Sequence, residues 1–284
     1  MAGRLVCGGL RGARGYHEGA SAERVTKART AALKALELDG SVPEAHMALG
    51  VVKAFYDWGF PGAEEAFKRA LALNPNSAIA HDWYGYYLLW FRRWDEATAE
   101  LGRAVELDPV SAIIGVDLGW ALVIAGRRHE AIAQVRKIFE LDPKNVFALG
   151  ILGWAYMGKG IYKEALATFE KRAEASRRDP SDLSSLAAAC VLTDGMVRAL
   201  QLLGEIKEKG KSKPGKAWNL VTVYRALASR DHRYYSDYFL WLEKASEEHS
   251  LNLVWTSAST YSDSATLHSD PRWVAFRKKL GLPP

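Results

Sequence analysis

A short motif that ends in proline recurs along the chain at intervals of 34 residues. It is ALALNP up to Pro75, AVELDP up to Pro109 and IFELDP up to Pro143. The following intervals, to Pro180 and then to Pro214, are 37 and 34 residues. A fixed period of this length is typical of repeat architectures, in which each unit buries its apolar face against its neighbours. We therefore predict a stack of similar units.

Each unit has the pattern of two amphipathic helices. In the first helix a glycine recurs at Gly50, Gly85, Gly119 and Gly153, and in the second an alanine recurs at Ala63, Ala97, Ala131 and Ala165. A large apolar residue follows each alanine by four positions, so the two side chains share one helix face. The closing Pro75, Pro109 and Pro143 lack an amide hydrogen and end each second helix. The units are predicted to be helical hairpins.

A 34-residue unit with this order of glycine, alanine, large apolar residue and proline resembles the tetratricopeptide repeat (TPR) family. The resemblance covers about residues 26–248, and it is strongest from Ala28 to Phe169. Beyond that, Arg172 stands where a small alanine is usual, and Ala199 comes three residues early. The resemblance implies an all-α, right-handed superhelical solenoid of stacked antiparallel helix pairs. In that family the first helices line a concave groove that holds peptide segments of partners.

The predicted boundaries follow the period. A half repeat with only a second helix covers residues 23–40, and TPR 1 to TPR 4 cover 41–75, 76–109, 110–143 and 144–180. Degenerate repeats follow at 181–214 and 215–249, with a C-terminal cap at 250–284. Residues 1–22 carry glycine and arginine where a periodic helix is needed, so they are left as an irregular segment.

The tail, LHSDPRWVAFRKKLGLPP, resembles the segment that closes the repeat array of bacterial multidomain regulators. Those proteins carry a winged-helix, kinase or cyclase module, which this chain lacks. Here Asp270 is expected to cap a short helix and Pro271 to be its first residue, with Trp273, Phe276 and Leu280 at helical spacing. Two alternatives follow for the array that begins in mid-repeat. The chain is a piece of a longer regulator, or its first 20 residues cover the exposed face.

The residues expected to line the groove are aromatic or apolar. In peptide-holding members of the family, an Asn after the repeat glycine and a Lys four residues before that Asn clamp a terminal carboxylate. This chain has Met47, Asp82, Val116 and Gly150 at the Lys position, so the resemblance carries no clamp over. The predicted groove residues are Val51, Phe55, Tyr86, Trp90, Trp120 and Trp154. They favour a hydrophobic or amphipathic partner segment, and the alternative is packing between neighbouring repeats.

No catalytic, cofactor or metal site is predicted. The stretch GWAYMGKG, residues 153–160, matches most of a phosphate-binding loop, but Gly160 replaces the required Ser or Thr and Gly153 falls inside a predicted helix. The seven histidines show no paired metal spacing, and no Gly-x-Ser-x-Gly elbow occurs. We therefore predict that the chain is not an enzyme.

The charge pattern indicates neither nucleic acid nor membrane as a partner. The net charge of +5 is spread along the chain, and the basic run from Lys207 to Lys216 has no interleaved aromatic residues. The most apolar run, Val110 to Gly126, is interrupted by Asp117. Two widely separated cysteines suit a reducing compartment, so a cytoplasmic location is predicted.

Three function classes remain open from the sequence. The first is a non-catalytic protein–protein interaction scaffold, as the sensory or assembly arm of a transcriptional or signalling regulator. Its partner is a protein, a peptide or an N-terminal module of the same polypeptide. The second is a self-associating structural adaptor, and the third is a nucleotide-binding enzyme.

Overall fold

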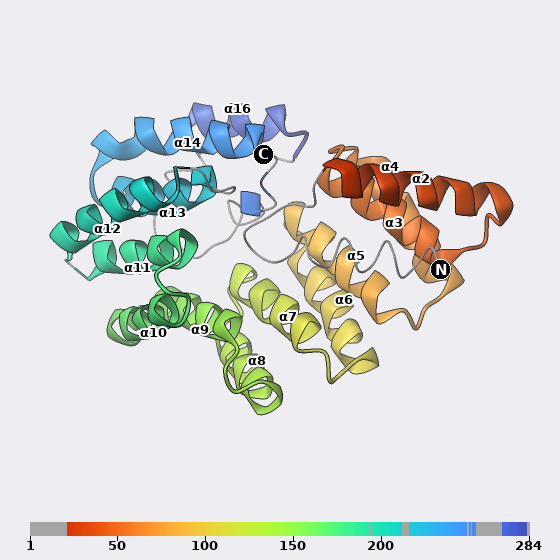
Figure 1. The fold of residues 1–284 in the computed structure, drawn as a ribbon, viewed down its shortest axis with the longest axis horizontal. Helices are drawn as coiled ribbons and strands as arrows, with labels where there is room; N and C mark the ends of the chain where they lie inside the picture. The colour runs from red at the N-terminus through yellow and green to blue at the C-terminus, as the bar shows by residue number, and fades with distance from the viewer. Residues whose placement is uncertain are drawn as a thin grey trace. The chain divides into compact units, whose positions relative to one another are not determined.

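The computed structural model describes residues 22–193, 195–211, 216–248, 250, 252–253 and 269–282. Every regular element in these ranges is a helix (Figure 1). Nearly all of the irregular segment predicted at residues 1–22, and much of the predicted cap, lie outside the described residues. The predicted all-α fold of helix pairs is confirmed.

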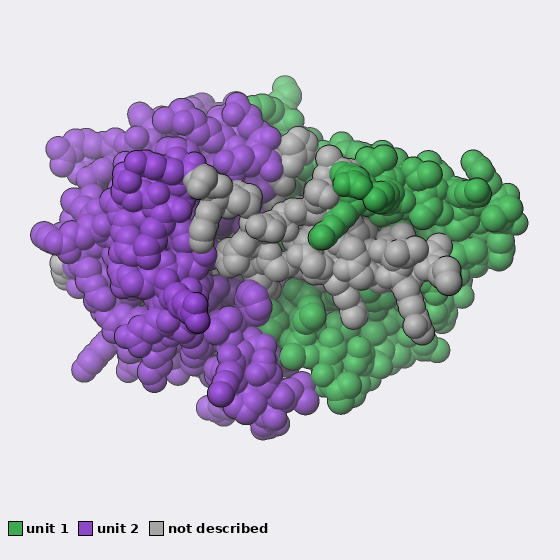
Figure 2. Space-filling model, in the orientation of Figure 1, with its two compact units in different colours: residues 1–117, 277–284 green, residues 118–276 purple. Residues whose placement is uncertain are grey.

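The chain divides into two compact units, which are coloured separately in Figure 2. Unit 1 comprises residues 1–117 and 277–284, and unit 2 comprises residues 118–276. The division passes through two helices, α7 (Ala112–Ile124) and α16 (Pro271–Lys279). Each unit is therefore described by itself.

Unit 1 begins with the single helix α2 (Ala22–Leu38). Two helix pairs follow: α3 (Pro43–Phe55) with α4 (Phe60–Leu73), and α5 (Ala78–Trp90) with α6 (Trp94–Leu107). Each helix packs on the next one along the chain, and α3 also contacts α5. The first helices of successive pairs are thus neighbours, which is the arrangement that a stacked repeat requires.

Unit 2 continues the same alternation of first and second helices. It contains α8 (Arg128–Leu141), α9 (Val146–Gly158), α10 (Tyr162–Ala175), α11 (Pro180–Leu192), α12 (Met196–Lys209), α13 (Lys216–Arg230), a 3₁₀ turn η2 (His232–Tyr234) and α14 (Tyr235–Glu247). Here α9 packs on α10, α11 on α12 and α13 on α14, and α11 also contacts α13. The helices keep the predicted order, and the exact boundaries of the individual repeats stay predictions.

Small residues let the two helices of a pair approach closely. A Cβ on Gly85 would lie 2.6 Å from Leu101 Cγ, and a Cβ on Gly153 would lie 2.5 Å from the Phe169 ring. Real Cβ atoms do not approach so closely, so any larger residue would force the helices apart. The second-helix alanines Ala63, Ala97, Ala131 and Ala165 are all 0 % exposed.

The turn between the helices of a pair has a left-handed residue at the same place in four pairs. These residues are Trp58 (φ 53°), Arg92 (φ 59°), Gly126 (φ 77°) and Gly160 (φ 72°). They are spaced 34 residues apart, and glycine adopts this conformation without strain. The stretch GWAYMGKG therefore consists of the end of α9, with Gly153 inside the helix, followed by a turn that needs Gly160 for its backbone.

Candidate functional site

The six residues predicted to line a groove all lie on first helices. Val51 and Phe55 are on α3, and Tyr86 and Trp90 are on α5; these four belong to unit 1. Trp120 on α7 and Trp154 on α9 belong to unit 2. The two sets are therefore described in turn.

In unit 1 the predicted groove residues form an aromatic cluster between two helix pairs. The Phe55 ring centroid lies 5.5 Å from that of Tyr86 and 6.3 Å from that of Trp90, and Trp90 also contacts Phe60 at 6.2 Å. Val51, Phe55 and Trp90 are at most 2 % exposed, whereas Tyr86 is half-buried. Tyr86 is therefore the member of this set with an open surface, and the others pack the repeats together.

In unit 2 the two tryptophans are also buried, at 5 % exposure for Trp120 and 9 % for Trp154. The Trp154 ring meets the Phe169 ring edge-on at 5.5 Å. Trp120 Cζ2 lies 3.0 Å from the position of a Cβ on Gly150. Both indoles thus contribute to packing around α9. Whether they also contact a partner stays a prediction.

The sequence reasoning missed a row of apolar residues on the first turns of the first helices. Ile79, Ile113 and Phe147 are each the second residue of their helix, α5, α7 and α9, and they keep the 34-residue spacing. Ile113 is 52 % exposed, Ile79 and Phe147 are half-buried, and the nearby Val110 is 76 % exposed. Each lies seven residues before the residue that follows the repeat glycine, so it shares that residue's helix face. The same period that revealed the glycines could have revealed these first-turn residues.

Arg172, noted in the sequence as a departure from the repeat pattern, is buried in unit 2. Its Nη2 lies 2.7 Å from Oδ1 of Asp182, and the two residues are 6 % and 3 % exposed. Its Nη1 lies 2.2 Å from the position of a Cβ on Gly150. The guanidinium therefore fills the space that a side chain at position 150 would occupy, in the layer of Trp120.

Both charges of this pair replace small or apolar residues. The equivalent pairs in the preceding repeats are Ala70 with Ala80, Ala104 with Ile114, and Ile138 with Ala148. Among the junctions compared, the cation and the carboxylate thus occur together at the one that contains Gly150. A buried cation requires a partner, and Asp182 supplies one.

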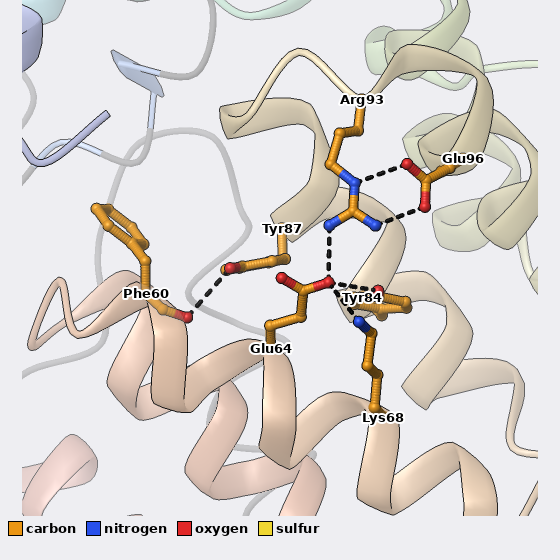
Figure 3. A network of polar contacts seen from close by, with 7 residues as sticks. All are labelled: Phe60, Glu64, Lys68, Tyr84, Tyr87, Arg93 and Glu96. Carbon is orange, nitrogen blue, oxygen red and sulfur yellow. Dashed lines mark hydrogen bonds and ion pairs between the residues drawn. The ribbon is translucent and has the colours of Figure 1, made fainter. Parts of the chain in front are cut away.

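A polar network joins the two helix pairs of unit 1 (Figure 3). Oε1 of Glu64 accepts hydrogen bonds from Arg93 Nη1 at 2.7 Å and from the Tyr84 hydroxyl at 3.1 Å, and Lys68 Nζ lies 2.9 Å away. The same guanidinium donates to Glu96. Glu64 on α4 is thereby tied to α5 and to the turn that precedes α6.

The network shifts the pKa values of its members. Burial opposes ionisation of Glu64, but hydrogen bonds from Arg93, Lys68 and Tyr84 outweigh it and lower the pKa of the Glu64 carboxyl to about 2. Burial, together with the neighbouring Glu64 charge, raises the pKa of Tyr84 to about 12. Glu64 therefore stays ionised and Tyr84 stays protonated over the whole physiological range.

The basic residues of the hairpin turns contact groups of the chain itself. Arg127 forms a bidentate pair with Glu130, and Lys159 Nζ lies 3.0 Å from His129 Nε2. Both basic side chains therefore have a structural role within the chain.

The fold also supplies aromatic rings that the basic run near residue 210 lacks in sequence. Lys207 Nζ lies 5.6 Å from the Tyr224 ring centroid, and Lys216 Nζ lies 5.9 Å from that of Trp241. Tyr224 is only 5 % exposed, and Glu205 and Glu208 bind other lysines of the run. The surface is therefore mixed in charge.

Among the described residues, no group of His, Cys, Asp or Glu is arranged to hold a metal ion. None of the described helices has the length and apolar character needed to span a membrane.

Comparisons with known proteins agree with the geometry. A family model described as tetratricopeptide repeat matches residues 59–112 and 116–182. Among solved structures, PilW, described as a widely conserved type IV pilus biogenesis factor, matches with a TM-score of 0.62 at 18% identity, over 80% of this chain and 96% of that one. The pilF protein of Pseudomonas aeruginosa matches with a TM-score of 0.55 at 19% identity, over 80% of this chain and 99% of that one. A comparison with curated proteins found no match.

The helix pairs, their 34-residue period and their close glycine–apolar contacts define an all-α helical-repeat protein. Over residues 59–112 and 116–182 the chain consists of tetratricopeptide repeats. Proteins with this architecture are generally interaction scaffolds without catalytic activity, since stacked helix pairs offer an extended binding surface.

Proposed function

We propose that the chain is a non-catalytic scaffold that binds a hydrophobic or amphipathic segment of a partner protein on its first helices. The observation that carries the proposal is the exposure of Ile113, which belongs to the first-turn row, and of Val110 close to it in sequence. Ile113 is 52 % exposed and Val110 is 76 % exposed. Ile79, Val110 and Ile113 all belong to unit 1, where they offer apolar surface that a partner helix or extended segment can cover.

The burial of the predicted groove residues gives each a place in this proposal. Tyr86, half-buried and seven residues after Ile79, is proposed as a direct contact. Val51, Phe55 and Trp90 in unit 1, and Trp120 and Trp154 in unit 2, are proposed as packing residues that hold the first helices of their own unit in place. Covering the exposed half of one isoleucine contributes about 1 kcal/mol, so several such residues must act together.

The test is partner capture from a cell lysate with the intact chain as bait, followed by a titration with the captured protein. Ile113→Asp is expected to weaken binding by about tenfold or more, because it places a charge in an apolar contact. Leu141→Asp, at a residue 48 % exposed at the end of the second helix α8, is the matched control and should bind as the wild type does. Equal binding by both variants and the wild type would contradict the proposal.

Replacing the buried residues Trp120 and Trp154 has a different expected effect. The double variant Trp120→Ala/Trp154→Ala should lose partner capture and also lower the thermal midpoint, since both side chains are buried. Loss of capture in this variant alone, with full capture by Ile113→Asp, would move the binding surface away from the first-turn row.

Two finer statements belong to the same proposal. The scaffold is proposed to act as the assembly arm of a signalling or transcriptional regulator, and sequence upstream of Met1 in the native gene tests this.

A cytoplasmic location is proposed because the one described cysteine, Cys190, is buried and free. Finding a fusion protein that carries this chain in another compartment would contradict the proposed location.

A further inference from the structure

The second helix α12 has an apolar stripe on its solvent-facing side. Val197 is 73 % exposed and Leu200 is 42 % exposed. Gly204, one turn further, has no atom within 4 Å of the position that a Cβ would take. The three residues are spaced by three and four positions, so they lie along one face of the helix. The opposite face, with Ala199, Leu203 and Ile206, is buried. The stripe therefore points directly into solvent, and α12 lies at the edge of unit 2 (Figure 1).

The other second helices have a proline or a polar residue at the position of Val197. The equivalents of Val197 are Pro61 on α4, Asp95 on α6, His129 on α8 and Lys163 on α10. The equivalents of Gly204 include Lys68, Arg136 and Glu170, with Gly102 on α6. Among the described second helices from α4 to α12, the last thus combines an exposed β-branched residue with a bare glycine seven positions later.

The stripe is self-complementary. In an antiparallel pair of α12 helices centred between Leu200 and Gln201, Val197 of one copy lies opposite Gly204 of the second copy. The projecting valine then fits where the facing helix has no side chain, and this occurs twice about a two-fold axis. Leu200 of each copy lies beside the axis. A glycine at this place allows the two backbones a close approach that a larger residue would prevent.

The charges of the helix ends fit the same arrangement. The N-cap residue of α12 is Gly195, which gives the first backbone amides no side-chain acceptor. The antiparallel pairing places Glu208 of the second copy opposite Thr193, next to those amides. A carboxylate at a helix N-terminus is favourable, because the amides point at it and the helix dipole is positive there. Glu208 is 70 % exposed and is held on the surface by Lys211.

We propose that the α12 stripe is a homodimer interface, in which a second copy of this chain packs antiparallel across Val197, Leu200 and Gly204. This surface lies on a second helix, so it is separate from the first-turn row of the proposed partner site. One helix face is smaller than a standard protein interface. The dimer is therefore weak, with a dissociation constant on the order of tens of micromolar or more.

Sedimentation velocity on the full chain, from about 1 to about 500 µM, tests the proposal. The weight-average mass is expected to rise from that of the 31.4 kDa chain towards twice that value. Leu200→Glu should keep the chain monomeric throughout, because two carboxylates would meet near the axis. Val274→Glu, at a residue 43 % exposed on α16, is the matched control and should associate as the wild type does.

Gly204→Gln separates association from folding. Glutamine favours a helix more than glycine does, so this variant should raise the thermal midpoint, yet its side chain blocks the place of the facing valine. The expected result is a more stable monomer. A wild-type chain that stays monomeric over the whole range would overturn the proposal. So would dimers of Leu200→Glu or Gly204→Gln as strong as those of the wild type.

Discussion

Arg172 and Asp182 show how a departure from the repeat pattern at one residue is matched by another. The cation and the carboxylate are both nearly inaccessible to water, and they stand where other junctions have alanine or isoleucine. Desolvation of two charges offsets most of their attraction, so a buried pair of this kind adds little net stability over an apolar pair. Removing one partner of the pair therefore lowers the stability of the fold far more than replacing both partners does.

We expect Arg172→Ile alone to lower the free energy of unfolding by about 3–5 kcal/mol, because Asp182 keeps a buried charge without this cation. The double variant Arg172→Ile/Asp182→Ala copies Ile138 and Ala148 of the preceding junction. It should fall within about 2 kcal/mol of the wild type. Urea unfolding of the wild type, both single variants and the double variant measures the coupling. A double variant that loses the sum of the two single losses would show that the charges act independently.

The glycine and alanine register could be predicted from the sequence, because close helix approach requires small residues at a fixed spacing. The exposure of the predicted groove residues could not. Phe55 and Trp90 are buried because they pack against each other, and Trp90 also packs against Phe60, so the burial depends on several side chains together. The partner of Arg172 could have been predicted from the sequence, because ten residues later Asp182 stands where the preceding repeats have Ala80, Ile114 and Ala148.

At the scale of elements, ionic contacts join successive second helices and turns. Arg29 on α2 binds Asp57 before α4, Glu64 on α4 binds Arg93 before α6, and Glu170 on α10 binds Arg198 on α12. Most of these pairs are half-exposed, and exposed pairs contribute little stability. The Glu64 network differs because three donors converge on one carboxylate.

This network predicts a specific response to acid. The pKa of Glu64 in the folded chain is about 2, below its unfolded value of 4.5. A lowered pKa contributes stability that is fully present above pH 4.5 and is lost as the pH falls towards 2. We expect Glu64→Gln to lower the free energy of unfolding at pH 7 by about 1 kcal/mol and to flatten the acid loss below pH 5.

Thermal unfolding of Glu64→Gln between pH 7 and pH 2.5 measures this response. Glu65→Gln, at the exposed neighbouring residue of the same helix, is the matched control and should keep the wild-type acid profile. Parallel pH profiles for the wild type and Glu64→Gln would mean that the network does not lower the pKa of the Glu64 carboxyl in solution.

At the scale of the whole molecule, stability is carried by contacts between neighbouring helices. In unit 2, α14 packs on α13, which packs in turn on α11 and α12. In unit 1, α3 packs on α2, α4 and α5. A run of helices built in this way is approximately a one-dimensional array, in which the stability of a repeat depends on itself and on its neighbours. Residues 277–284, which belong to unit 1, are the exception. Local unfolding should therefore stay local.

Leu242→Ala tests this locality, because Leu242 on α14 is 0 % exposed and its truncation leaves a cavity between α14 and its neighbours. The expected loss is about 2–4 kcal/mol in the helices that contact the cavity. Hydrogen exchange measured by mass spectrometry should accelerate in α13 and α14 and remain at the wild-type rate in α3 and α4. Because exchange reports the free energy of each opening event, a uniform acceleration from α3 to α14 would mean that the chain unfolds as one cooperative body. The one-dimensional description would then have to be abandoned.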